Sequence, residues 1–126
     1  MKQIISTDSA PQAIGTYSQA VKIDKTVYVS GQLGLDPKTM NLVGKSFKEQ
    51  THQVFRNLEA IAKTVDCSLN NFVKFNVYLT DLKNFAAFNE IAEQFLTSPY
   101  PARAAVEVCA LPKGGIVEVE GIIVVD

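Results

Sequence analysis

The fold is decided by two stretches, SFKEQTHQVFRNLEAIAKTV at residues 46–65 and FVKFNVYL at residues 72–79. In the first, apolar side chains recur every three or four residues, the period of an α-helix with one face on a core. In the second, they recur every two residues, the period of a half-buried β-strand. Ser46 predicts the N-cap of the helix, and Glu49 predicts the returning bond of a capping box. A long amphipathic helix therefore precedes a strand.

The same periods predict the other elements. A second helix is expected from about Asn84 and is ended by Pro99 and Pro101. Further strands are expected at residues 3–5, 21–23, 27–30, 103–109 and 116–125. This order predicts an α+β domain in which both helices pack on one face of a mixed sheet. No repeat or linker divides the 126 residues, so we expect residues 1–126 to form a single domain.

Alternation along the strands also predicts what each face of the sheet carries. The purely apolar sets are expected under the helices, and these are Val73, Phe75, Val77, Leu79, Ala104, Val106, Val108, Val117 and Val119. The opposite face is expected to mix polar and apolar side chains, namely Phe72, Lys74, Asn76, Tyr78, Arg103, Ala105, Glu107, Cys109, Ile116, Glu118, Glu120, Ile122 and Val124. Because monomers seldom expose so large an apolar area, we expect further copies of the chain to cover this mixed face.

Composition limits the possible functions. The net charge of −1 creates no strong field for nucleic acid or anionic lipid, so neither is expected as a partner. No apolar run approaches the roughly 20 residues of a membrane span, and residues 1–13 lack the pattern of a signal peptide. Cys67 and Cys109 have no companions at metal-ligand spacing, so we expect two reduced thiols and no metal. These features predict a cytoplasmic protein.

Arg103 and Glu118 are the main candidates for chemistry. If their strands are antiparallel neighbours joined through residues 111–115, with Gly114 and Gly115 at a hairpin tip, both side chains share the mixed face. An arginine can hold a carboxylate through two parallel hydrogen bonds, and a nearby glutamate can orient or deprotonate water. The alternative is an ion pair that serves only the structure.

Four other features carry weaker signals. His52, the only histidine, is expected on the solvated side of its helix, which excludes a Ser-His-Asp triad and a histidine-rich metal site. Gly31 and Gly34 predict a turn or bulge where the chain leaves the sheet, without a phosphate-loop pattern around them. Tyr17 lies in an irregular stretch. Asn89 interrupts the second helix, and its amide is either solvated or bonded outside that helix.

Taken in order, these segments resemble the RidA/YjgF family, also called the YER057c/UK-type or L-PSP group. The resemblance runs over nearly the whole chain, and residues 100–108 are its most specific part. It is carried by IGTYSQA at 14–20, VSGQ at 29–32, NL at 57–58, VYLTDL at 77–82, Asn89, YPARAAVEV at 100–108, LPK at 111–113 and VEVE at 117–120.

The resemblance implies a chorismate-mutase-like fold and a homotrimer whose sheets line a central barrel, with three clefts between subunits. It implies hydrolysis of reactive 2-imino acids, such as 2-iminobutanoate and 2-iminopropanoate, to 2-oxo acids and ammonia without a cofactor or metal. Arg103 is similar to the arginine that binds the substrate carboxylate, and Glu118 to the glutamate that positions the attacking water. The substrate-binding positions of the family match Tyr17, Ser30, Gly31, Asn89 and, through its backbone, Ala105.

Two departures from the family pattern bear on the site. Thr16 replaces the usual proline before the tyrosine, which predicts a looser loop, and Ala105 stands where many relatives carry cysteine, which excludes thiol chemistry there.

Two other functions stay open. A nuclease or translation inhibitor, a label given to parts of the family, would bind RNA tightly and in a salt-dependent way. A sensor would bind a 2-oxo acid in the same cleft without turnover.

Overall fold

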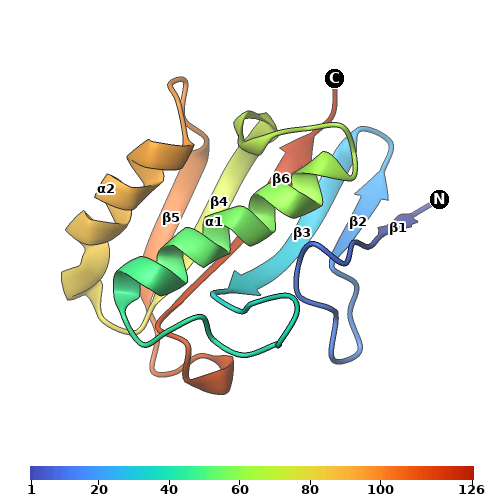
Figure 1. The fold of residues 1–126 in the computed structure, drawn as a ribbon. Coiled ribbons are helices and arrows are strands. Elements are labelled where there is room, and N and C mark those ends of the chain that lie inside the picture. Colours follow the sequence, from blue (N-terminus) through green and yellow to red (C-terminus); the bar gives the residue numbers. More distant parts are fainter.

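Two helices cover one face of a six-stranded mixed sheet in the computed structural model, which describes residues 1–126 (Figure 1). The strands are β1 (Gln3–Ile5), β2 (Ala20–Ile23), β3 (Thr26–Leu33), β4 (Phe72–Leu79), β5 (Ala102–Glu107) and β6 (Val117–Val124). The helices are α1 (Phe47–Lys63) and α2 (Phe85–Phe95), with short 3₁₀ turns η1 (Leu69–Asn71), η2 (Leu82–Asn84) and η3 (Pro112–Gly114). The predicted α+β class is confirmed.

The start of α1 follows the predicted cap in part. Ser46 is the N-cap, and its Oγ accepts a hydrogen bond from the Glu49 backbone N–H at 3.1 Å. The Glu49 side chain does not return to the Ser46 backbone; its Oε1 accepts instead from Ser46 Oγ at 2.9 Å. The predicted capping box is therefore wrong in its second bond, because the serine hydroxyl itself engages the carboxylate.

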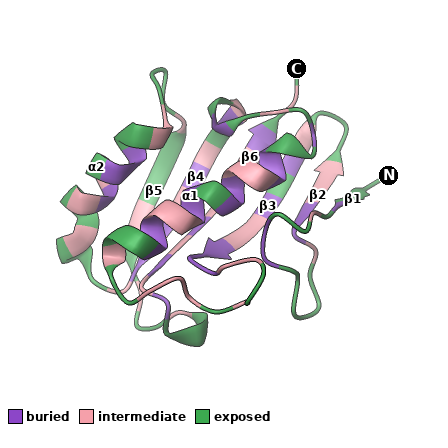
Figure 2. Cartoon of the chain, in the orientation of Figure 1, coloured by how far each residue is buried: buried purple, intermediate pink, exposed green.

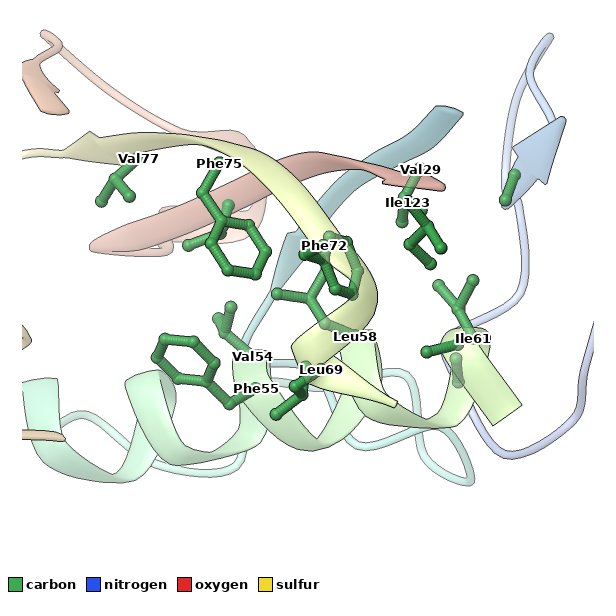
Figure 3. Packing of buried hydrophobic residues seen from close by; sticks show 14 of the residues in the cluster. Val29, Val54, Phe55, Leu58, Ile61, Leu69, Phe72, Phe75, Val77 and Ile123 are labelled. Atoms are coloured by element: carbon green, nitrogen blue, oxygen red, sulfur yellow. The ribbon is translucent and has the colours of Figure 1, made fainter. Parts of the chain in front are cut away.

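The apolar stripe of α1 forms the core with the sheet. Val54, Leu58 and Ile61 have no exposed surface, and Figure 3 shows them directed at the side chains of the strands. Phe55 packs edge-on against Phe75 of β4, with ring centroids 6.3 Å apart. The buried positions of β3, β4 and β6 lie under the same helix (Figure 2). Removal of this apolar surface from water is what holds α1 on the sheet.

The strand order differs from the expected one. The order is β1-β2-β3-β6-β4-β5, so β4 lies between β5 and β6. β4 pairs with β5 in parallel and with β6 antiparallel. The predicted hairpin of the last two strands is wrong, and residues 108–116 instead cross β4 by way of η3. Alternation reveals which residues of a strand share a face, but it does not reveal which strands are neighbours. β4 pairs along both of its edges and therefore separates β5 from β6.

The predicted faces of β5 are reversed. Phe75 and Val77, which are buried under the helices, pair in register with Arg103 and Ala105. Since paired residues of neighbouring strands leave the sheet on the same side, Arg103 and Ala105 lie on the covered face. Val106, expected in the core, is 47% exposed. β5 is an edge strand that the helices cover only in part, so its more apolar set does not have to face inward.

A bulge changes the first residues of β4. The register with β6 shifts between Phe72 and Lys74. Phe72 is therefore buried in the core, whereas Val73 is exposed, which reverses the prediction for both. The predicted inward positions of Phe75 and Val77 are confirmed.

No helix covers the other face of the sheet, here called the uncovered face. Strand register aligns a row of side chains across it, namely Ile4, Val21, Tyr28, Ile122 and Lys74. Ile4 and Tyr28 are each about half exposed. A single chain therefore leaves a contiguous apolar strip in contact with water, which is the feature expected of a surface that further copies cover.

Truncation of the core provides a test of this packing. We expect Leu58→Ala to lower the free energy of unfolding by about 2–5 kcal/mol, because it removes a fully buried side chain and leaves a cavity. Arg56→Ala, an exposed change on the opposite side of the same helix, should stay within about 0.5 kcal/mol. Denaturant unfolding at one fixed protein concentration measures both, and equal losses would contradict the assigned helix face.

Candidate functional site

Glu118 owes its direction to the strand that carries it. It lies on β6 between Val117 and Val119, both fully buried, so its side chain leaves on the uncovered face. The register of β3 against β6 shifts between Val29 and Gln32, which confirms the bulge predicted around Gly31. A Cβ atom on Gly31 would lie 2.7 Å from Glu118 Oε2. Only glycine lets the carboxylate approach the bulge this closely.

Four of the predicted site residues meet here. A cavity of about 450 Å³ is lined by Tyr17, Ser30, Gly31 and Glu118, together with Glu120. Ser30 Oγ donates to the Ser18 carbonyl oxygen at 2.6 Å. Tyr17 is half exposed, and its Oη accepts from the Ile14 backbone N–H at 3.3 Å. This space, called the Glu118 cavity below, places a carboxylate beside an aromatic ring and an irregular backbone.

The carboxylate in this cavity is perturbed. Burial raises the pKa of Glu118 above its ordinary value, and the nearby negative charge of Glu120 adds to the rise. Glu120 Oε2 in turn accepts from Asn76 Nδ2 at 3.1 Å. Burial and the charge of Glu120 also raise the pKa of the Tyr78 hydroxyl. A glutamate with a raised pKa is a stronger base than an ordinary carboxylate, which suits it to accept a proton and return it.

Arg103 is held on the other side of the sheet by α2. Its Nη1 donates to Asn89 Oδ1 at 2.6 Å, so of the two alternatives for this amide the bond outside its helix is the one observed. The guanidinium carbon lies 5.2 Å from the centre of the Phe85 ring and 5.9 Å from that of Phe88. These contacts orient the cation, while its other N–H groups stay free to bind an anion. Arg103 and Asn89 also line a cavity of about 460 Å³.

Ala105 belongs to the same group as Arg103. β5 is the last strand of the sheet, so one edge of its backbone has no partner within the chain. The Val108 N–H donates to the Leu79 carbonyl at 2.8 Å, and the direction of the backbone groups alternates along a strand. The N–H and C=O of Ala105 therefore point to the free edge.

The predicted site residues thus form two groups within one chain. Arg103 and Ala105 lie on the covered face and edge of β5, with Asn89 of α2 beside Arg103, while Glu118 faces the uncovered side. The prediction that Arg103 and Glu118 share a face is wrong, because the register of β4 with β5 pairs Arg103 with the buried Phe75. Neither group alone combines the guanidinium of Arg103 with the carboxylate of Glu118, and the lysine that lines the Glu118 cavity, Lys113, donates to the Met40 carbonyl oxygen.

Three residues contribute to the site without a predicted role. The rings of Phe85 and Phe88, which belong to the apolar stripe of the second helix, support the guanidinium of Arg103. The spacing of Phe85, Phe88 and Asn89 places all three on one side of α2, and this was the available signal. Glu120 was predicted on the mixed face but was given no role. Its alternation with Glu118 places both carboxylates on the uncovered face, where they interact.

His52 differs from its prediction. Its ring packs edge-on against Phe95, with centroids 5.4 Å apart, and its Nε2 is buried without a hydrogen-bond partner. Burial lowers the pKa of the imidazole, and the charges of Arg56 and Lys48 lower it further. The predicted solvated position is therefore wrong: the ring fills space between α1 and α2.

Cys67 and Cys109 are free thiols, as expected. The structure gathers no group of three or more His, Cys, Asp or Glu side chains that could hold a metal ion. Neither helix has both the length and the apolar composition that crossing a membrane would require.

Comparison with known proteins gives matches over nearly the whole chain. Residues 7–125 match the family model described as Endoribonuclease L-PSP. The chain is 48% identical to the 2-iminobutanoate/2-iminopropanoate deaminase of Capra hircus over 124 residues, which cover 98% of this chain and 90% of the relative. It is 45% identical to the human protein of the same name, over 97% of this chain and 89% of the relative.

Solved structures agree with these matches. RidA from an Antarctic Psychrobacter species superposes with a TM-score of 0.95 at 59% identity, over 98% of this chain and 99% of that one. E. coli TdcF with bound serine superposes with a TM-score of 0.92 at 36% identity, over 98% and 99% of the two chains. Sequence and fold agree over the full length, and the chain belongs to the RidA/YjgF family, whose family model is described as Endoribonuclease L-PSP.

Proposed function

We propose that this protein hydrolyses 2-imino acids, such as 2-iminobutanoate and 2-iminopropanoate, to 2-oxo acids and ammonia. The observation that carries the proposal is the combination of an oriented, exposed guanidinium group at Arg103 with a partly buried carboxylate of raised pKa at Glu118. The first can anchor a carboxylate, and the second can activate water. Relatives 45–48% identical to the chain carry the name of this activity.

The proposed active site needs two copies of the chain. Arg103 and Glu118 lie on opposite faces of one sheet, so we place the reaction in a cleft between Arg103 of one subunit and the Glu118 cavity of the next. The apolar strip on the uncovered face supports assembly through that face. We propose a homotrimer, with the three sheets lining a central barrel and one cleft at each of the three boundaries.

The chemistry follows from the two groups. Arg103, held by Asn89, binds the substrate carboxylate and so orients the protonated imine for attack. Glu118 accepts one proton from water while the water oxygen bonds to C2, which gives a carbinolamine. Glu118 then protonates the amine, and the C–N bond breaks to release ammonia as Glu118 accepts the hydroxyl proton. The ammonia takes up that proton, so the products are a 2-oxo acid and ammonium, and Glu118 returns to its carboxylate form. Water supplies every atom that is added, so the balance requires no redox partner.

The alternatives fit the site less well. A sensor of 2-oxo acids would use Arg103 but has no need for a carboxylate whose pKa is raised by burial. A ribonuclease would bring phosphates against Glu118 and Glu120 in a chain of net charge −1, an unfavourable field for an anionic substrate.

The two free thiols, Cys67 and Cys109, are in keeping with a reducing compartment, and we place the reaction in the cytosol.

Loss of the anchoring cation tests the function directly. A threonine or serine dehydratase generates the imine, semicarbazide traps it, and the wild-type protein should reduce semicarbazone formation by hydrolysing the imine first. We expect Arg103→Ala to lower this activity about 100-fold or more, because a charge-assisted contact to the carboxylate is lost. Arg56→Ala, an exposed arginine on α1, is the matched control and should be unaffected. The proposal would be contradicted if wild-type protein of normal oligomeric mass did not reduce semicarbazone formation.

Mixing of subunits tests the shared cleft. Arg103→Ala and Glu118→Gln proteins should each be nearly inactive alone. If each cleft takes Arg103 and Glu118 from different subunits, co-refolding equal amounts should restore about a quarter of the wild-type activity, because that share of clefts receives both intact residues. Co-refolded Arg103→Ala with wild type provides the reference for dilution. Mixed oligomers without recovered activity would show that one chain supplies both residues.

The pH dependence of turnover tests the role of Glu118. Its carboxylate form is the base, so kcat should fall as the pH drops through its raised pKa, which lies above the ordinary value of 4.5. Glu120→Gln removes the neighbouring negative charge and should move this acid limb to lower pH. The raised pKa also means that the fold favours the protonated form, so the gain in Tm from Glu118→Gln should be absent below the ordinary value of 4.5, grow as the pH rises from there, and be complete above the raised pKa. An acid limb that stays in place in Glu120→Gln would contradict the coupling.

A further inference from the structure

Gln19 is one of the few polar side chains that the fold buries, with 4% of its surface exposed. Its Oε1 accepts a hydrogen bond from the Thr7 backbone N–H at 2.7 Å. Its Nε2 lies 3.0, 3.2 and 2.6 Å from the carbonyl oxygens of Thr7, Ala10 and Pro11. Two N–H groups therefore serve three carbonyl oxygens, with one bond shared. Every polar atom of this amide is engaged with the backbone of residues 7–11.

The backbone of Gln19 is tied to the sheet as well. Its carbonyl oxygen accepts from the Ser30 N–H at 3.0 Å, and β2 begins at the next residue, Ala20. Residues 6–19 leave the sheet after β1 and return to it at β2. Gln19 therefore fastens both ends of this irregular segment, one through its side chain and the other through its main chain.

This segment is a wall of the Glu118 cavity. Pro11, Gln12, Ile14 and Tyr17 line that cavity on the side opposite the sheet residues. Two other side-chain bonds within the wall lie at the exposed surface: Ile14 N–H donates to Tyr17 Oη at 3.3 Å, and Ser9 N–H donates to Thr7 Oγ1 at 3.1 Å. The Ser30 hydroxyl holds only the end of the wall, at the Ser18 carbonyl. Hydrogen bonds of a buried amide are shielded from competing water and hold their geometry more firmly. The Gln19 amide is therefore the main constraint on where the wall stands.

We propose that Gln19 is a positioning residue for the reaction: it fixes residues 11–17 so that Tyr17 stands beside the Glu118 cavity before substrate arrives. The inference rests on the proposed function. A wall that is ordered in advance does not have to be ordered during binding. The amide is the side chain that fits, because a carboxylate would present only acceptors to three carbonyl oxygens, and a hydrocarbon would leave them unpaired.

The test is a cycle of steady-state kinetics with Gln19→Met, Tyr17→Ala and the double variant, each assayed well below its Tm. If Gln19 acts through Tyr17, Gln19→Met should raise KM about tenfold and change kcat by less than about twofold. In the Tyr17→Ala background, the same substitution should raise KM by less than about twofold, because the group that Gln19 positions is already missing.

A merely structural role predicts a different result. Partial unfolding lowers the number of active sites, which reduces the apparent kcat and leaves KM unchanged. That outcome would overturn the proposal, and so would an equal rise in KM in both backgrounds. Gln19→Asn, which keeps the amide but shortens its reach by one methylene, serves as a second variant if Gln19→Met does not fold.

Hydrogen exchange separates this inference from the proposed function, since it needs no turnover. The amide of Thr7 donates directly to Gln19, so Gln19→Met should speed exchange within residues 7–17 about tenfold or more. Gln32→Met is the matched control. Gln32 is a buried amide that lines the same cavity but donates to the Ser30 carbonyl, and its loss should change exchange in residues 7–17 by less than about twofold. A wild-type protein without turnover would refute the proposed function alone, while unchanged exchange in Gln19→Met would refute the role of Gln19.

Discussion

The burial of one face of the sheet under α1 fixes the direction of Glu118, and the register of the sheet then fixes the face on which Arg103 lies. Val117 and Val119 have no exposed surface because Leu58 and its neighbours on α1 cover them. Glu118, which lies between these two valines, must leave on the other side. No polar contact is needed to aim this carboxylate. Its position follows from the removal of apolar surface from water, the largest favourable contribution to the fold.

The same constraint divides the chemistry of a single chain. In-register pairing with Phe75 keeps Arg103 on the covered face, where Asn89 and the aromatic rings of α2 orient it. One sheet cannot carry both Arg103 and Glu118 into one cavity. Under the proposed function, assembly of several copies covers the apolar strip on the uncovered face. The same assembly completes the site, which a single chain leaves incomplete. Stability and activity would then depend on the same contact between copies.

The sequence predicted most of the elements and less of their arrangement. The helical period and Ser46 located α1, and strict alternation placed Phe75 and Val77 in the core. Alternation does not reveal which strand is the neighbour, so the sequence could not show that β4 separates β5 from β6. On the edge strand β5, where both faces are partly exposed, the apolar composition of one set of residues predicted the wrong face for Arg103. The grouping of Tyr17, Ser30, Gly31 and Glu118 came from the family resemblance, because no period links residues so far apart in the chain.

The two carboxylates of the uncovered face have an electrostatic cost that the proposed substrate can offset. Glu120 raises the pKa of Glu118, so the pair is strained by like charge in the free chain. A protonated 2-imino acid is a zwitterion, whose negative end matches Arg103 and whose positive nitrogen relieves the repulsion between the glutamates. The 2-oxo acid product keeps the negative end but loses the positive one. Under the proposed function, the site therefore favours the substrate over its product, and Glu120 beside Glu118 would serve both binding and release.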